Sequence, residues 1–117
     1  AGTRPQVLRF PGGSINPYNA AIYPELTAEM LRRGFAYFDW NVSGMDTAVG
    51  GASAEEIREA ALRGLEERRV FLLLHDSAGK QTTVEALPGI IEAYRAAGFS
   101  FDRLTVEVTP VVFGYVE

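Results

Sequence analysis

Four short apolar runs recur at intervals of about 30 residues, and this spacing constrains the fold of the chain more than any other feature. The runs are Val7 to Phe10, Phe35 to Val42, Val70 to Leu74 and Phe99 to Leu104. Stretches with helical periodicity separate them, so we expect a strand–helix unit that is repeated several times. Such alternation predicts an α/β fold with a parallel sheet and right-handed crossovers. The third run has no polar alternation, as expected of a strand that is covered on both faces.

Helix start signals lie between these runs. Ser53 and Glu56 have the spacing of a capping box, in which each residue hydrogen-bonds the backbone of the other. Thr82 and Glu85 repeat that spacing before the last helical stretch. Pro88 interrupts this stretch, so we expect its regular part to begin there.

Composition indicates one ordinary domain over residues 1–117 and excludes several kinds of site. The chain has a formal charge of -4, no Cys and a single His. Thiol catalysis, Cys-type zinc clusters and multi-histidine metal sites are therefore excluded for this polypeptide alone. It has no basic stripe, so we expect no nucleic-acid partner. No stretch approaches the roughly 20 apolar residues that span a bilayer, and residues 1–10 have no signal-peptide core. Secretion stays open, because a signal can be removed or can lie upstream.

Uncommon polar residues follow the apolar runs. In parallel sheets and barrels the working residues lie at the carboxyl ends of the strands. Arg9 falls there after the first run, Trp40 to Asp46 around the end of the second, and His75 after the third. Asp46 could accept the ring N–H of His75, which would fix the tautomer and favour the imidazolium form. A histidine supported by a carboxylate is a natural general acid.

Other interpretations of these residues stay open. A single histidine at a strand end also fits a satisfied structural residue. Arg9 also fits a surface arginine before a turn, and Trp40 fits either a core residue or a pocket wall. Two rival motifs fail. A phosphate loop over residues 74–81 would need Gly in place of Leu74 and Ser or Thr in place of Gln81, and no serine lies in a nucleophile elbow.

Three segments stand in a distinctive order. They are RFPGGS at residues 9–14, DWNVSGMD at 39–46 and LLLHD at 72–76, which leads into TVEALP at 83–88 and GFSF at 98–101. In order and spacing they resemble the later motifs of polysaccharide deacetylases, the NodB-homology group of carbohydrate esterases. The likeness extends from about residue 7 to about residue 104.

The resemblance implies roles for individual residues. His75 matches the histidine that protonates the leaving amine, and Asp46 matches the carboxylate that orients this histidine. Arg9 matches the arginine that pairs with the catalytic-base aspartate. The residues expected to bind substrate are Leu73, as the wall for the acetyl methyl group, Trp40 and Pro11. Thr47 stands where many members have an aromatic residue, so that side of the groove departs from the pattern.

The family's first two motifs are missing. They are a Thr-Phe-Asp-Asp-Gly segment with the base and one metal ligand, and a paired-histidine segment with the other two ligands. The resemblance therefore implies the C-terminal half of a distorted (β/α) barrel, with a zinc cofactor whose ligands are not in this chain. We expect the chain alone to be inactive.

The implied activity of the complete enzyme is metal-dependent hydrolysis of the N-acetyl amide in peptidoglycan or chitin-like glycans, outside the cell or in its envelope. The alternative is a non-catalytic module, a half barrel that binds a glycan or a partner. Open strand edges at Val7–Leu8 and at the fourth run, and an apolar tail from Val106 to Phe113, predict a homodimer or a complex with an N-terminal half.

Overall fold

Four short strands form two parallel pairs in the computed structural model, which describes residues 2–114. The contacts divide the chain into two compact units. The second unit is Trp40–Phe101, and the first consists of the described residues before and after it. Each unit is an α/β arrangement with parallel strands, as the alternating sequence pattern predicts. The single domain expected over residues 1–117 stays a prediction.

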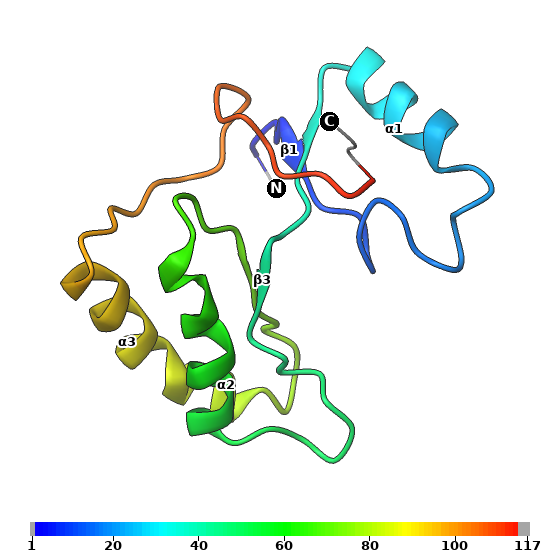
Figure 1. Ribbon diagram of the computed structural model, residues 1–117. Coiled ribbons are helices and arrows are strands. Elements are labelled where there is room, and N and C mark those ends of the chain that lie inside the picture. Colours follow the sequence, from blue (N-terminus) through cyan, green and yellow to red (C-terminus); the bar gives the residue numbers. More distant parts are fainter. Residues whose placement is uncertain (1, 115–117) are drawn as a thin grey trace. The chain divides into compact units, whose positions relative to one another are not determined.

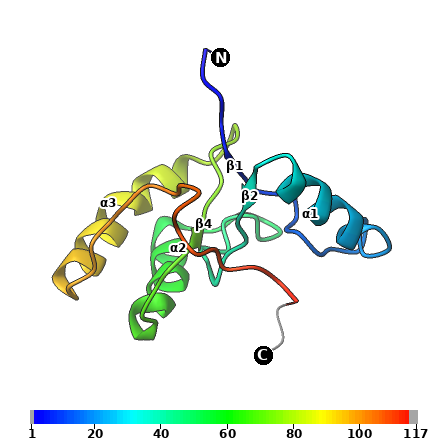
Figure 2. The same ribbon diagram turned by 90° about the horizontal axis from the view of Figure 1, so that it is seen from above.

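The first unit contains one strand–helix–strand repeat. β1 (Val7–Leu8) pairs in parallel with β2 (Ala36–Tyr37), and α1 (Tyr23–Arg32) connects them. Figure 2 shows α1 next to this strand pair. The helix has a proline in its first turn, where a missing backbone N–H costs no hydrogen bond.

The second unit contains another such repeat and ends in a long helix. β3 (Val42–Ser43) pairs in parallel with β4 (Leu72–Leu73), and α2 (Ala54–Ala61) with the 3-10 helix η1 (Leu62–Glu66) connects them. α3 (Gln81–Ala96) follows β4 and lies beside α2 (Figures 1 and 2). The predicted capping box begins α2, because the Ser53 Oγ accepts the Glu56 N–H while the Ser53 N–H donates to Glu56 Oε1, both at 3.1 Å.

The core of the second unit lies between α2 and α3. Ile57 and Ala61 of α2 are fully buried against three residues of α3, Ala86, Ile90 and Tyr94. The Tyr94 hydroxyl donates to the Ala61 carbonyl at 2.5 Å, so the one polar side-chain atom of this cluster has a hydrogen-bond partner. Burial of each large aliphatic side chain contributes about 2 kcal/mol, so Ile57 and Ile90 both stabilise the packing of this helix pair.

The second apolar run is not one strand, contrary to the prediction for Phe35 to Val42. It is divided between β2 and β3 because the backbone changes its partner between them. The Phe38 N–H donates to Leu8, the Asp39 N–H donates to Val111, and the Asn41 N–H donates to Phe71. The Asn41 side chain also accepts from the Phe71 N–H at 2.7 Å, which no sequence periodicity reveals.

The predicted strand from Phe99 to Leu104 is wrong, since these residues form no strand. The Phe99 ring packs edge-on against Tyr94, with 5.0 Å between ring centroids, and the Arg95 guanidinium lies over the Phe101 ring. These contacts hold the start of the segment against the end of α3 instead of against a neighbouring strand.

Two further expectations are corrected. α3 begins at Gln81 rather than at Pro88, because buried residues on both sides of the proline keep the helix in contact with the core. Lys80 is its N-cap and makes no side-chain cap, so the expected Thr82–Glu85 box is absent. β4, expected to be covered on both faces, is half-buried.

We predict that Gly64→Ala destabilises the second unit. A Cβ on Gly64 would lie 2.5 Å from the Tyr94 hydroxyl oxygen and 2.8 Å from a Val42 methyl, both of which are held by the core. Overpacking of this kind costs about 1–3 kcal/mol. The free energy of unfolding, measured by urea denaturation, should fall by that amount.

The matched control is Gly89→Ala in α3. A Cβ on Gly89 meets only the flexible Arg58 side chain, with Nε at 3.2 Å, and alanine favours a helix interior by about 0.5–1 kcal/mol over glycine. An equal loss of stability in both variants would contradict the explanation by close packing.

Candidate active site

The pairing of β3 with β4 brings Asp46 and His75 to the same edge. Ser43 is in register with Leu73, and the Gly44 N–H extends the ladder to the Leu73 carbonyl at 3.1 Å. Asp46 follows β3 by three residues and His75 follows β4 by two. The parallel direction of the strands therefore places both side chains beyond the carboxyl ends, as the sequence predicts.

The turn before Asp46 has an unusual backbone. Met45 has φ of 55°, in the left-handed region that non-glycine residues rarely adopt, and its N–H donates to the Ser43 Oγ at 3.1 Å. Gly44 lies so close to the Leu74 side chain that a Cβ there would overlap it, with a second contact at 3.3 Å to Ile57. This turn directs the Asp46 side chain back toward the end of β4.

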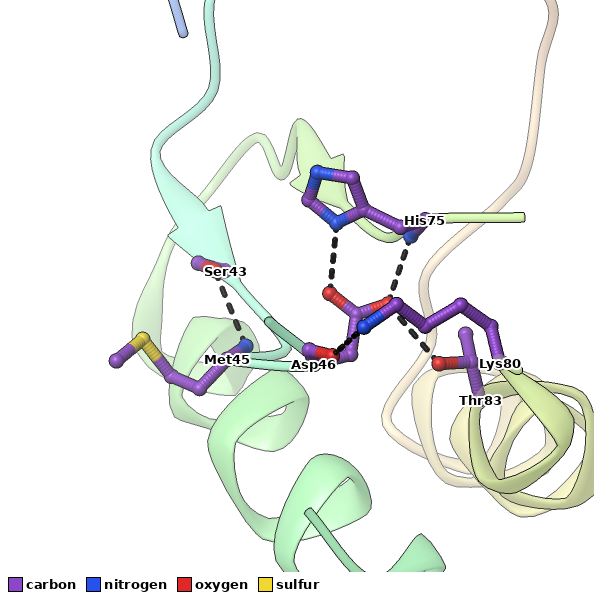
Figure 3. A network of polar contacts seen from close by, with 6 residues as sticks. All are labelled: Ser43, Met45, Asp46, His75, Lys80 and Thr83. Atoms are coloured by element: carbon purple, nitrogen blue, oxygen red, sulfur yellow. Dashed lines mark hydrogen bonds and ion pairs between the residues drawn. The ribbon is translucent and has the colours of Figure 1, made fainter. Parts of the chain in front are cut away.

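The Asp46 carboxylate is buried and accepts three hydrogen bonds. Its Oδ1 lies 2.8 Å from His75 Nδ1, and its Oδ2 accepts the His75 backbone N–H at 2.7 Å and the Thr83 hydroxyl at 3.0 Å. Figure 3 shows all three contacts meeting on this one carboxylate. Only 1% of the Asp46 side chain is exposed. A buried charge is tolerated only when such partners compensate for the lost water.

These partners set the ionisation of Asp46. Burial raises the pKa of the carboxyl group, but the hydrogen bonds from the His75 ring, the His75 backbone and the Thr83 hydroxyl outweigh it and lower the pKa below its ordinary value. The carboxylate is therefore ionised at neutral pH and can only accept hydrogen bonds.

The charge on Asp46 fixes which nitrogen of His75 carries a proton. Because the carboxylate can only accept, Nδ1 must be the donor at 2.8 Å. Nε2 lies on the far side of the ring from Asp46 (Figure 3), and the side chain is 30% exposed. Nε2 is thus the atom that gains or loses a proton, and in the charged ring it is an acid directed away from its carboxylate support.

Two contacts from the start of α3 were missed by sequence reasoning. The Thr83 hydroxyl contacts the carboxylate, and the Lys80 ammonium group donates to the Asp46 backbone carbonyl at 2.6 Å. The only signal in the sequence was the short separation between His75 and the first turn of the next helix.

The other predicted site residues are placed as follows. In the second unit, Leu73 lies in β4 and Trp40 two residues before β3, and both are half-buried. In the first unit, Arg9 is exposed and donates to the Phe10 carbonyl at 3.1 Å, and Pro11 is exposed in the turn that follows. The roles of all six predicted residues stay predictions; the contact expected between Asp46 and His75 is present.

The residues of this chain do not fit the three-ligand metal site that the resemblance implies. Within residues 2–114, no three His, Cys, Asp or Glu side chains are grouped so that they could hold a metal ion. His75, the single histidine of the chain, uses Nδ1 for Asp46. In the same range, no helix has the length and apolar character needed to cross a membrane.

We predict that Asp46→Asn removes an acid-sensitive part of the stability. Because the pKa of Asp46 is lower in the folded chain than in the unfolded one, its contribution is fully present above about pH 4 and is lost as the pH falls through the folded value. In the variant, the amide replaces an acceptor by a donor that faces other donors, so unfolding at pH 7 should become easier by about 1–3 kcal/mol. Urea denaturation at pH 7 and at pH 3 measures both effects.

An isosteric change at an exposed carboxylate, Glu85→Gln, provides the control. If the stability of Asp46→Asn varied between pH 7 and pH 3 as much as that of the unsubstituted chain, Asp46 would not be the group that titrates.

Comparison with known proteins identifies proteins that are similar to this chain in sequence and in fold. No model of a protein family matches the chain. YheN of Bacillus subtilis (strain 168), named by inference as a polysaccharide deacetylase, is 30% identical over 118 aligned residues, which cover 94% of this chain and 38% of YheN.

Solved structures of deacetylases are also similar to this chain. The catalytic domain of peptidoglycan N-acetylglucosamine deacetylase from Eubacterium rectale superposes with a TM-score of 0.84 at 28% identity, over 95% of this chain and 52% of that one. A polysaccharide deacetylase from Bacillus cereus gives a TM-score of 0.75 at 24% identity, over 96% of this chain and 54% of that one, a likeness of fold alone. The chain thus spans about half the length of these structures. In sequence and in fold it is a homologue of the polysaccharide deacetylases, and it corresponds to part of their domain.

Proposed function

We propose that this chain supplies the general acid of a polysaccharide deacetylase, an enzyme that hydrolyses the N-acetyl amide of sugars in peptidoglycan or chitin-like chains. The observation that carries the proposal is the buried Asp46 carboxylate, which holds His75 by Nδ1 and leaves Nε2 free to act. The likeness to the Eubacterium rectale enzyme, which is named for peptidoglycan N-acetylglucosamine, supports this class of substrate.

The chemistry of amide hydrolysis explains why such a pair is needed. The carbon–nitrogen bond breaks only when the departing nitrogen receives a proton, because an amide anion is a very poor leaving group. In the proposed reaction water adds to the acetyl carbonyl carbon and gives a proton to a base outside this chain. The Nε2–H of the charged His75 gives its proton to the departing nitrogen, so the sugar leaves as an amine while acetate forms. The Asp46 carboxylate contacts Nδ1 and holds the orientation of the ring throughout the transfer.

We propose that the remaining parts of the site lie outside residues 1–117. The chain covers about half of its solved homologues, whose fold is a (β/α) barrel, so it would form the C-terminal half of such a barrel. The catalytic base and the ligands of the divalent metal, zinc by resemblance, would come from the other half. Within this chain, Arg9 would pair with that base, and Leu73, Trp40 and Pro11 would line the substrate groove.

A partner and a location follow from the same proposal. Each parallel pair in the described chain is two-stranded and so has outer edges without a strand partner, while Val84 and Leu87 on α3 are 61% and 40% exposed. Covering these surfaces favours a homodimer or a complex with an N-terminal half. Since the substrates are cell-wall or chitin-like glycans, the complete enzyme would work outside the cell or in its envelope.

We predict that the purified chain alone binds no zinc at the family site and releases no acetate from N-acetylated chitooligosaccharides. The reason is the lack of a three-ligand cluster in the described residues. A zinc titration monitored by calorimetry tests metal binding, and an enzymatic acetate assay tests activity. Stoichiometric zinc that a chelator removes, accompanied by acetate release, would contradict the assignment of ligands to the other half.

The positive test adds the missing half. Mixing the chain with the N-terminal part of the Eubacterium rectale catalytic domain should restore zinc-dependent acetate release. His75→Ala should then lower turnover by about 100-fold or more, the usual contribution of a general acid, with zinc binding unchanged. The control is Glu85→Gln, an exposed change on α3 that should leave turnover unaltered.

Glycan binding without acetate release in every such mixture would favour the alternative function, a non-catalytic glycan-binding module. Loss of zinc binding in His75→Ala would show that the histidine has been given the wrong role.

We also predict that the chain associates in solution. Light scattering between about 1 and 100 μM should give a mass that rises with concentration, because the exposed strand edges and apolar side chains favour contact between copies. A constant monomer mass, with no binding of a dye that detects apolar surface, would show that no partner is needed.

A further inference from the structure

Thr83 stands out among the residues around the proposed acid. The residue is 5% exposed, and its hydroxyl donates to Asp46 Oδ2 at 3.0 Å. Because Asp46 is ionised and can only accept, the direction of this hydrogen bond is fixed. Figure 3 shows the hydroxyl approaching the carboxylate from α3, on the side away from the His75 ring.

Helix capping does not explain the position of Thr83. It is the third residue of α3, whose N-cap is Lys80 and whose first turn has no side-chain cap. Threonine inside a helix is mildly unfavourable, because its β-branched side chain loses freedom there. The contact with Asp46 is therefore the interaction that accounts for a buried hydroxyl at this position.

The two oxygens of the Asp46 carboxylate accept different hydrogen bonds. Oδ2 receives Thr83 and the His75 backbone N–H, and Oδ1 receives only the His75 ring. Two donors from different segments on one oxygen oppose rotation about the Cβ–Cγ bond. With Oδ2 held, Oδ1 stays opposite Nδ1.

The backbone of Asp46 is held from the same helix start. The Lys80 ammonium group donates to the Asp46 carbonyl at 2.6 Å, one turn before Thr83. Side chain and main chain of Asp46 are thus both fixed by the first turn of α3.

We propose that Thr83 is a positioning residue for the Asp46–His75 pair: its hydroxyl keeps the carboxylate turned so that Oδ1 faces Nδ1, which holds the proton on Nδ1 and leaves Nε2 as the reacting nitrogen. The purpose of this arrangement rests on the proposed deacetylase function. The arrangement itself does not, and it can be measured in the chain alone.

The experiment observes the imidazole directly. His75 is the only histidine in the chain, so a two-bond proton–nitrogen NMR spectrum contains one imidazole and needs no assignment. At alkaline pH, where the ring is neutral, the nitrogen shifts give the ratio of the Nδ1–H to the Nε2–H tautomer. In the unsubstituted chain we expect the Nδ1–H form to dominate.

The test variant is Thr83→Val, which keeps the shape of the side chain and removes the hydroxyl. We expect the tautomer ratio to fall by about five-fold, the usual effect of one hydrogen bond on an equilibrium. Thr83→Ser, which restores a hydroxyl, should return the ratio toward that of the unsubstituted chain. Thr83→Ala serves as a second hydroxyl-free variant if valine does not fold.

The matched control is Thr82→Val, the same substitution one residue earlier and about 100° around the helix. Backbone amide spectra and urea denaturation confirm that each variant compared is folded. A tautomer ratio that does not change in folded Thr83→Val or Thr83→Ala, or that changes equally in Thr82→Val, would overturn the proposal.

Failure here differs from failure of the proposed function. If the tautomer responds to Thr83 while no mixture releases acetate, the deacetylase proposal is contradicted and the role of Thr83 in holding the pair stands. If acetate is released and depends on His75, but the tautomer ratio does not change in the Thr83 variants, the role of Thr83 is contradicted and the deacetylase proposal stands.

Discussion

The second unit depends on one buried anion. The Asp46 carboxylate is almost fully removed from water, and an isolated charge in such a place would cost several kcal/mol. Its donors come from His75, two residues after β4, and from the first turn of α3, while the carboxylate itself follows β3. Burying the charge therefore requires three segments to meet at the same point. The hydrogen bonds that stabilise the buried charge are therefore also the ones that orient His75.

A second buried aspartate lies beyond a strand end in the first unit. Asp39 lies two residues after β2 and is 4% exposed. It accepts the Ser14 hydroxyl at 2.5 Å, the Ser14 N–H at 2.8 Å and the Phe113 N–H at 2.7 Å. The loop after β1 and the end of the described chain are thereby tied to the end of β2. The tail from Val106 to Phe113, expected to need a partner, is in part anchored within its own unit.

The sequence predicted what local patterns encode. Parallel pairing, the capping box at Ser53 and the meeting of Asp46 with His75 follow from periodicity, cap spacing and the common edge of parallel strands. The errors arise where tertiary contacts override those patterns. Phe99 and the residues after it look like a strand, yet aromatic and cation–π contacts hold the segment's start on α3. The role of Thr83 was beyond sequence reasoning, since nothing local shows that the start of α3 faces a carboxylate 37 residues earlier.

The contacts around the proposed acid all form within the second unit. Asp46, His75, Thr83 and Lys80 all belong to Trp40–Phe101, so every contact that orients the proposed acid forms within one unit. An acid that must give its proton at a defined point is most effective when its orientation is set before substrate binds. The helix pair that buries Ile57 and Ile90 holds α3 in place, and α3 holds Asp46. In the proposed function, the hydrophobic core thus acts on the acid through α3, from which the Thr83 hydroxyl holds the Asp46 carboxylate.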